Sequence, residues 1–305
     1  MKDTVFFRQA ELLLRILPLI HKEEVFGLKG GTAINFFVRD LPRLSVDIDL
    51  AYLPVNEREV ALDSIGNALV RISKQIEKRV PGVRIVHKRI QKTHFVSGLV
   101  VRRGEATVKI EPNLVIRGSV YQPEVKSLST KAEKLFELSM EIRILSKAEL
   151  YAGKICAALD RQHPRDLFDI HILLKNEGLD AAIRRAFIVY LISHPRPMIE
   201  VLNPGFTDFR AVYENEFQGM MAENVTFEEL LATREHLVSV LLSELSHQEK
   251  QFIVSIKEGA PRWELLWLEG IQDLPAVRWK LLNIGRMNPT KHKEAVQKLK
   301  HYLGV

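Results

Sequence analysis

The sequence predicts an α+β protein: an N-terminal mixed β-sheet domain with flanking helices, followed by a mostly helical C-terminal domain. Strand patterns, with apolar and polar residues alternating, occur only before about residue 146. Beyond it, apolar residues recur at the three- and four-residue spacing of helices. At 305 residues the chain exceeds the usual size of one domain, so we expect two, residues 1–145 and 146–305.

The N-terminal half alternates predicted helices and strands. Its first elements are a helix at 5–20, a strand at 25–30, a short helix capped by Thr32 and a strand at 46–53. Asn56 and Glu59 resemble a capping box that opens a long helix. Strands at 83–90, 95–102 and 106–116 follow, the last two joined by a hairpin turn.

The C-terminal half contains helix signals alone. Ser146 and Glu149 form an S-x-x-E capping box for a helix that ends near residue 161, and Pro164 suits the first turn of the next helix. Breaks are expected at 195–204, 259–261 and 288–289. We interpret Trp263, Trp267 and Trp279 as core or interface aromatics, with stacking on RNA bases as the alternative.

Composition limits the classes of protein. Cys156 is the only cysteine, so neither an intramolecular disulfide nor a cysteine metal cluster can form. Charged residues interrupt the apolar N-terminal segment, which argues against a signal peptide, and no apolar run is long enough to cross a bilayer. We therefore expect a cytoplasmic protein that does not act at a membrane.

Basic residues are unevenly placed in a chain of formal charge +6. Residues 71–103 contain ten Lys or Arg and one acid, and residues 278–305 contain seven and one. Clusters of this kind are typical of phosphate-backbone binding. A solvated face that keeps the protein soluble is the alternative for each cluster.

Two carboxylates stand in a segment that is otherwise apolar. In a strand, Asp47 and Asp49 point to one side while Val46, Ile48 and Leu50 point to the other, with the two aspartate Cα atoms about 6.6 Å apart. Carboxylates this close repel each other unless a cation lies between them. Mg²⁺ suits the position because it prefers a few carboxylate oxygens together with water and phosphates.

The turn Gly30-Gly31-Thr32 precedes these aspartates. A strand that ends in glycines and turns into a helix presents backbone N–H groups to a phosphate, and glycine lets the phosphate come close. The stretch lacks the P-loop pattern and the G-x-G-x-x-G pattern. G-G-T and D-x-D at this spacing are together typical of the nucleotidyltransferase fold.

Three segments resemble the AbiEii/AbiGii nucleotidyltransferase toxins of abortive-infection and toxin-antitoxin systems. They are KGGTAI with RLSVDIDL, then ELYAGKICAALDRQHPRDLFDIHILL at 149–174, and LPAVRWKLLNIGRM at 274–287. The resemblance implies transfer of a nucleotide from an NTP to RNA, often the 3′ end of tRNA, which stops translation and serves phage defence. It also implies a companion antitoxin of winged-helix character.

The resemblance also implies roles for individual residues. Gly30, Gly31 and Thr32 would cradle the triphosphate, with Ser45 beside the metal-binding strand. Asp47 and Asp49 would bind the metal, Lys154 a nucleotide phosphate, and Asp166 would be an active-site acid.

The residues themselves leave another interpretation of the later motif open. Lys154 could extend its ammonium harmlessly to solvent. Asp166 could favour the helix N-terminus while Arg165 pairs with Asp169 four residues on. We favour function for Lys154 and Asp166, and structure for Arg165 and Asp169.

Glu111 is the candidate for a third carboxylate, which two-metal phosphoryl chemistry commonly uses. It shares a strand face with Thr107 and Lys109 while Val108 and Ile110 point away. The alternative is a strand-end acid paired with Lys109 or another surface base.

We therefore expect a Mg²⁺-dependent nucleotidyltransferase whose basic segments bind RNA. Asp47, Asp49 and Glu111 would hold two metal ions, and Gly30, Gly31, Thr32 and Lys154 the triphosphate. Two alternatives remain: an enzyme that modifies a small molecule such as an aminoglycoside, and a binding module that keeps the fold without catalysis.

Overall fold

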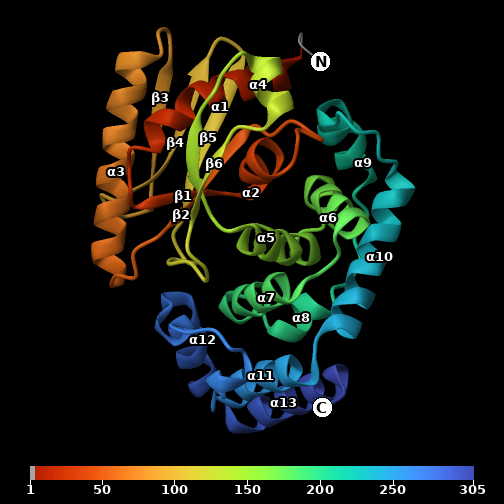
Figure 1. Ribbon diagram of the computed structural model, residues 1–305. Helices are drawn as coiled ribbons and strands as arrows, with labels where there is room; N and C mark the ends of the chain where they lie inside the picture. Colours follow the sequence, from red (N-terminus) through yellow and green to blue (C-terminus); the bar gives the residue numbers. More distant parts are fainter. Residues whose placement is uncertain (1–3) are drawn as a thin grey trace. The chain divides into compact units, whose positions relative to one another are not determined.

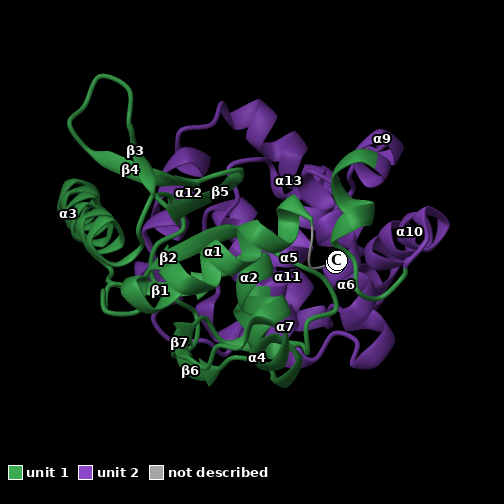
Figure 2. Ribbon diagram, turned by 90° about the horizontal axis from the view of Figure 1, so that it is seen from above, with its two compact units in different colours: residues 1–150, 215–224 green, residues 151–214, 225–305 purple. Residues whose placement is uncertain are grey.

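The computed structural model describes residues 4–305, which fall into two compact units (Figures 1 and 2). Unit 1 comprises Met1–Leu150 and Asn215–Asn224, and unit 2 comprises Tyr151–Glu214 and Val225–Val305. Unit 1 contains the mixed sheet, whereas the residues of unit 2, all of them described, form helices and loops without a strand. The predicted α+β class is confirmed.

The sheet of unit 1 has seven strands in the order β3-β4-β5-β2-β1-β7-β6. Their bounds are β1 Phe26–Lys29, β2 Asp47–Tyr52, β3 Arg84–Arg89, β4 Val96–Arg103, β5 Ala106–Asn113, β6 Glu124–Ser127 and β7 Glu141–Ile144. β2 with β5 and β1 with β7 are parallel pairs, and the other neighbours are antiparallel. The two central strands, β1 and β2, are those on which the sequence places the glycine turn and the aspartates.

Helices cover one face of this sheet. α1 (Val5–Ile20) contacts β5, and α3 (Arg58–Arg79) packs against β4 with its predicted stripe of Ile65, Leu69, Ile72 and Ile76 buried. His87 on β3 meets Ser73 of α3 through a 2.9 Å hydrogen bond, so His87 faces the helix. Leu99, Ile110 and Ile48 share that face by register and are fully buried. Asp47, Asp49, Lys109 and Glu111 therefore lie on the opposite face.

Unit 1 also contains shorter helices. α2 (Gly30–Ala33) continues as a π-helical turn, Ile34–Val38, and α4 (Thr130–Phe136) follows β6. α5 (Lys147–Asp160) carries the boundary between the units, since unit 2 begins at Tyr151.

Unit 2 is built from helices around α7 (Ala181–Ser193), whose residues from Phe187 to Ser193 are all buried. The other helices are α6 Pro164–Asn176, α8 Met198–Leu202, α9 Arg210–Val212, α10 Phe227–Glu244, α11 His247–Glu258, α12 Pro275–Gly285 and α13 Pro289–Leu303. Capping boxes at Thr226 and Ser246 start α10 and α11. No helix among residues 4–305 is long and apolar enough to cross a membrane.

Two predicted helix caps are wrong. Thr32 lies inside α2 rather than at its start, because the helix already begins at Gly30. The N-cap of α3 is Glu57, and Asn56 instead donates its side-chain N–H to Tyr52 Oη at 3.1 Å. Thr32 instead binds Asp47, fifteen residues on, and Asn56 binds the side chain of Tyr52 at the end of β2, four residues back.

Three elements lie outside the sequence prediction: β6, α4 and β7. β6 is a four-residue edge strand with mostly exposed side chains, so its sequence EVKS shows no apolar alternation. Trp267 and Trp279 are also exposed, so the core interpretation is wrong for these two residues.

Candidate functional site

Gly30 brings the turn between β1 and α2 against the side chain of Asp49. Its φ of +73° lies in the left-handed region, and a Cβ there would collide with Oδ2 of Asp49. Only glycine combines this backbone conformation with so close an approach to a carboxylate. The glycine turn and the D-x-D strand are therefore in direct contact.

Gly31 is equally constrained by its neighbours. A Cβ at this position would lie 2.6 Å from Nη2 of Arg43 and 3.1 Å from Oγ of Ser45. Arg43 is fully buried and donates from Nη1 to the carbonyl oxygen of Leu44 at 2.9 Å. The backbone of α2 thus packs directly on the segment that leads into β2.

Thr32 joins the same two segments. Its Oγ1 donates to the carbonyl oxygen of Asp47 at 2.6 Å and shares a 2.9 Å hydrogen bond with Ser45 Oγ. Both hydroxyl-bearing side chains are buried. This arrangement fixes the first residue of the D-x-D strand, while contact of Thr32 or Ser45 with a triphosphate stays a prediction.

Asp47 and Asp49 extend from β2 with Ile48 buried between them on the other face. Both aspartates are half-buried rather than enclosed. The parallel register pairs Asp47 with Lys109 and Asp49 with Glu111 on β5. The structure thus brings Glu111 beside the aspartates.

The carboxylate of Glu111 is already paired. Lys88 Nζ lies 2.5 Å from Glu111 Oε1, and both side chains are partly exposed. Lys88 is on β3, so its side chain crosses β4 at Gly98, its register partner. A Cβ at Gly98 would stand 3.7 Å from Lys88 Cδ and 2.9 Å from the carbonyl oxygen of Ile110. Such an ion pair is what the alternative interpretation of Glu111 expects, and its metal role stays a prediction.

The residues on this face fit a divalent cation bound together with a nucleotide. Among residues 4–305 no three His, Cys, Asp or Glu side chains lie close enough together to hold a metal ion. Asp47 and Asp49 are therefore a pair of candidate ligands that a third carboxylate from the described residues does not complete in this structure. Two carboxylates completed by water and phosphate oxygens are the ligands that Mg²⁺ prefers. The contact of Gly30 with Asp49 leaves the backbone beside that pair without a side chain.

A second group of charges lies in unit 2, where α5 and α6 meet. Lys154 Nζ is 2.6 Å from Asp166 Oδ1 and 3.0 Å from Asp169 Oδ2. The side chains are 8 % exposed for Lys154 and 1 % for each aspartate. The two aspartates are three residues apart on one face of α6, which lets one ammonium reach both.

Arg161 completes this group from the loop between α5 and α6. Its Nε donates to Asp166 Oδ2 at 2.6 Å and its Nη2 to Oδ1 at 3.1 Å, while the arginine side chain remains 62 % exposed. Burial by itself would raise the pKa of Asp166, but Lys154 and Arg161 outweigh burial and hold that pKa well below its usual range. Asp166 is therefore an ionised carboxylate with two cationic partners.

His163 starts α6 as its N-cap. Its Nδ1 accepts the backbone N–H of Arg165 at 3.1 Å. Burial, together with the nearby cations Arg165, Arg161 and Lys154, lowers the pKa of His163 to about 4. The imidazole is neutral at pH 7, which the accepting nitrogen requires.

The structure places Lys154 and Asp166 in contact and adds residues that the sequence interpretation did not assign to this group. Asp169, interpreted as a structural partner of Arg165, contacts Lys154. Arg161 was not singled out, although its position five residues before Asp166 across a short turn is a usable signal. Functional roles for this group stay predictions.

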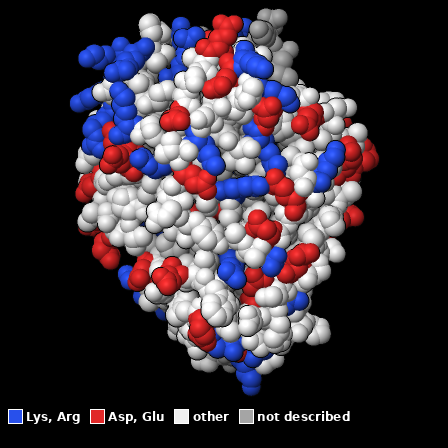
Figure 3. All heavy atoms as spheres, viewed as in Figure 1, with Lys and Arg blue, Asp and Glu red and all other residues white. Residues whose placement is uncertain are grey.

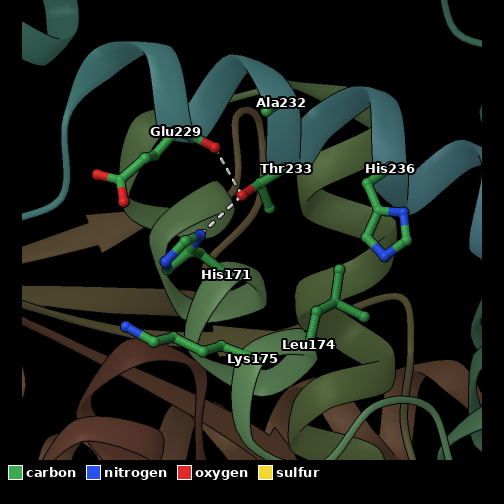
Figure 4. A pocket seen from close by; sticks show the side chains of 7 residues that line it. All are labelled: His171, Leu174, Lys175, Glu229, Ala232, Thr233 and His236. Carbon is green, nitrogen blue, oxygen red and sulfur yellow. Dashed lines mark hydrogen bonds between the residues drawn. The ribbon is translucent and has the colours of Figure 1, made fainter.

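A cavity of about 390 Å³ lies elsewhere in unit 2, between α6 and α10 (Figure 4). It is lined by His171, Leu174, Lys175, Glu229, Ala232, Thr233 and His236. Thr233 Oγ1 donates to the carbonyl oxygen of Glu229 at 2.7 Å, so it accepts from His171 Nδ1 at 2.9 Å. None of the site residues predicted from the sequence lines this cavity.

A mixed sheet whose glycine turn packs against a D-x-D strand defines the class of nucleotidyltransferases. The chain belongs to the AbiEii family: the family model described as the nucleotidyl transferase AbiEii toxin of a type IV toxin-antitoxin system matches residues 11–279. This match confirms the resemblance seen in the sequence, and it makes the protein a nucleotidyltransferase toxin of a type IV system.

A solved structure of similar fold is that of MenT4, a nucleotidyltransferase toxin from Mycobacterium tuberculosis H37Rv. The two chains superpose with a TM-score of 0.59 over 97 % of this chain and 95 % of MenT4, at 14 % sequence identity. At that identity the likeness shows the fold alone. A comparison with curated proteins gives no match.

Proposed function

We propose that this toxin transfers a nucleotide from an NTP to an RNA hydroxyl, at the 3′ end of tRNA, and thereby blocks translation. The observation that carries the proposal is the contact of Gly30 with Asp49, which sets a side-chain-free backbone turn beside two accessible carboxylates. A nucleoside triphosphate with its cation has chemistry complementary to that arrangement. The family membership supports the same reaction class.

Asp47 and Asp49 would hold Mg²⁺, with Glu111 as a further ligand if it leaves Lys88. When bound, the cation supplies neutralisation of the triphosphate charge and stabilises the pyrophosphate leaving group. Glu111 is the register partner of Asp49 on the neighbouring strand β5. The ion pair with Lys88 orients the carboxylate of Glu111 on that face. The register partner of Asp47, Lys109, adds a positive charge to the same face.

The chain's other residues position the substrates. Gly30 and Gly31 let the phosphates approach the backbone of α2, and Thr32 holds the start of β2 in place. Lys154 would contact a nucleotide phosphate, and Asp166 would keep the lysine ammonium oriented. Because Lys154 is held by two aspartates, it acts as a fixed charge rather than as a mobile one.

The basic segment at residues 71–103 is the proposed RNA surface. All ten of its Lys and Arg residues are exposed, on α3, β3, β4 and the adjoining loops. Lys and Arg side chains gather at the upper left of the space-filling view, where those elements lie in Figure 1 (Figure 3). Phosphate contacts of this kind predict binding that weakens steeply as salt rises.

The test incubates purified protein with Mg²⁺, each labelled NTP in turn and total tRNA, beside the Asp47→Ala variant. Label that enters RNA with the wild type alone would support the proposal and identify the preferred nucleotide. Intact NTP binding without transfer to any RNA would contradict the RNA acceptor and favour a small-molecule acceptor.

Growth gives an independent test in cells. Expression of the wild type should slow growth, and Asp47→Ala should relieve that effect. A non-catalytic binding module would be indifferent to the substitution. Co-expression of a winged-helix antitoxin encoded nearby is expected to restore growth, in keeping with the type IV family.

A further inference from the structure

Phe206 is an exposed aromatic side chain whose loop is fixed by two buried polar residues, Gln162 and Arg234. It lies in the loop at 203–209 that joins α8 to α9 in unit 2 (Figure 1) and is 49 % exposed. A single exposed phenylalanine on a surface needs no explanation. Two buried polar side chains that hydrogen-bond to the residues beside Phe206 do require an explanation.

Gln162 clamps the loop on both sides of Phe206. Its Nε2 donates to the carbonyl oxygen of Gly205 at 2.7 Å, and its Oε1 accepts the backbone N–H of Thr207 at 3.1 Å. Gln162 is itself buried and has a φ of +51°, a left-handed conformation that is strained for this residue. The backbone is therefore strained at Gln162. The two hydrogen bonds of its side chain fix the peptide groups on either side of Phe206.

Arg234 of α10 supports the phenyl ring from one side. Its guanidinium carbon lies 4.3 Å from the ring centroid of Phe206 and 5.3 Å from that of buried Phe209. Nη1 donates to the carbonyl oxygen of Thr207 at 2.6 Å and to Gln162 Oε1 at 3.1 Å. One ring face of Phe206 is therefore covered by a fixed cation, and the remaining exposure belongs to the rest of the ring.

The charge of Arg234 is compensated by carboxylates only in part. The arginine is 7 % exposed, forms no ion pair among residues 4–305, and leaves its Nε–H without an acceptor. Burial lowers its pKa, and Asp208 and Glu235 offset this only in part. A buried guanidinium costs free energy when no anion faces it. A phosphate-bearing ligand would supply the missing negative charge.

We propose that Phe206 is a stacking platform for a nucleobase, with Arg234 beneath the ring and Gln162 fixing the loop. Every base has a face that stacks on an aromatic ring, and ribonucleotides are commonly bound in this way. The positive charge under the ring favours a nucleotide over an uncharged aromatic molecule. The base is that of the NTP or of the RNA acceptor, so the inference rests on the proposed function.

The platform adjoins the charged group of unit 2. Gln162 follows Arg161, the residue whose guanidinium binds Asp166 through two hydrogen bonds. In the three-residue loop 161–163, Arg161 binds Asp166, Gln162 binds the Phe206 loop, and His163 caps the start of α6. A nucleotide base on Phe206 would lie beside the motif that the family resemblance links to the nucleotide.

The experiment measures equilibrium binding by full-length protein, with each ligand titrated in the absence of the other so that no transfer occurs. The ligands are a labelled single-stranded RNA, each NTP with Mg²⁺, and inorganic tripolyphosphate. The variants are Phe206→Leu, which keeps an apolar side chain without a ring, and Phe206→Trp, which restores a stacking surface. Val125→Ala is the control, because Val125 is 55 % exposed on β6 and lies outside the platform and both basic segments.

Phe206→Leu should weaken binding of one base-bearing ligand about 5-fold or more, the lower end of base–aromatic stacking. Phe206→Trp should restore the wild-type dissociation constant. Tripolyphosphate binding, which involves no base, should be unchanged in every variant, as should all binding by Val125→Ala. If Phe206→Leu weakens the binding of RNA alone, the stacked base belongs to the acceptor RNA. If it weakens the binding of the NTP alone, the stacked base belongs to the substrate nucleotide.

Wild-type dissociation constants for both RNA and NTP in Phe206→Leu would overturn the proposal. Melting temperatures check that each variant is folded. If the wild type transfers no nucleotide but Phe206→Leu still loses binding, the proposed function fails and the platform stands. If transfer occurs but Phe206→Leu binds normally, the platform alone fails.

Discussion

Two pairs of aspartates, Asp47 with Asp49 and Asp166 with Asp169, are treated in opposite ways by this fold. The first pair lies on the face of β2 away from α3 and is half-buried, two residues apart on a strand. The second is buried, three residues apart on a helix, with Lys154 between the carboxylates. The side chains of the first pair are partly accessible to a ligand, whereas those of the second are 1 % exposed and enclosed around Lys154.

The two pairs of aspartates should therefore contribute differently to the free energy of unfolding and to the reaction. A half-buried carboxylate contributes little to folding, so its replacement should affect the reaction alone. A buried carboxylate with a fixed cation is part of the folded structure, and its disruption should affect folding and reaction together.

Lys154→Met should lower the free energy of unfolding by about 3–5 kcal/mol, because it leaves Asp166 and Asp169 buried without the ammonium between them. Urea unfolding measures the loss. Arg161→Gln is the matched control, since it removes the other cation of Asp166 from a side chain that is 62 % exposed. A larger loss in Arg161→Gln than in Lys154→Met would contradict the contrast.

If Asp47 holds the cation as proposed, Asp47→Asn should lower nucleotide transfer roughly 100-fold, the effect of losing one group that stabilises the transition-state charge. The free energy of unfolding should stay within about 0.5 kcal/mol of the wild type, as for other accessible positions. Transfer rates and urea unfolding on the same preparation check both parts. A loss in free energy of unfolding comparable to that of Lys154→Met would show that both aspartate pairs contribute to the stability of the fold.

His163→Asn should change the pH dependence of stability. The folded pKa of His163 is about 4, below its ordinary 6.5, so the unfolded chain binds the proton first as the pH falls. Stability from this residue is complete above pH 6.5 and declines toward pH 4, by about 1–3 kcal/mol. Asparagine keeps an N-cap acceptor and does not titrate.

Unfolding free energies of wild type and His163→Asn, measured from pH 7.5 to 4, isolate this effect. The two curves should converge at neutral pH and separate in acid, with the variant the more stable there. Parallel curves would mean that His163 titrates alike in the folded and unfolded chain.

Lys88→Gln should have the smallest effect, lowering the free energy of unfolding by less than about 1 kcal/mol, because the pair with Glu111 is partly exposed. Arg8→Gln, which breaks the exposed pair with Glu105 in the same unit, should cost a similar amount. Urea unfolding at low and high salt compares them. A cost that persists at high salt in Lys88→Gln alone would give the Glu111 pair a structural role.

Much of the fold could be predicted because local patterns and the final packing agree. The alternation around Asp47 and Asp49 and the helical stripe on α3 survive unchanged in the folded chain. β6 and β7 were missed because four-residue strands are recognised by their neighbours rather than by their own sequences. The caps at Thr32 and Asn56 failed because each side chain binds a partner distant along the chain or in another element.

The candidate site could be predicted in composition but not in its contacts. G-G-T and D-x-D identified the segment, and the register places Glu111 beside Asp49 as its strand pattern suggests. The pairing of Lys88 with Glu111 depends on Gly98 in the strand between them, which no single motif contains. Lys154 reaching both aspartates depends on the approach of two helices, a property of packing rather than of spacing.

Asn215–Asn224 belongs to unit 1 although unit 2 supplies the chain on both sides of it. Its Met220 and Ala222 exchange backbone hydrogen bonds with Leu44 and Pro42, just ahead of the D-x-D strand. A ribosome must therefore translate Tyr151–Glu214, the first part of unit 2, before the segment that binds residues 42–44 exists. Unit 1, which carries Asp47 and Asp49, can therefore be completed only after about three-quarters of the chain has been translated, although the aspartates themselves lie in its first sixth.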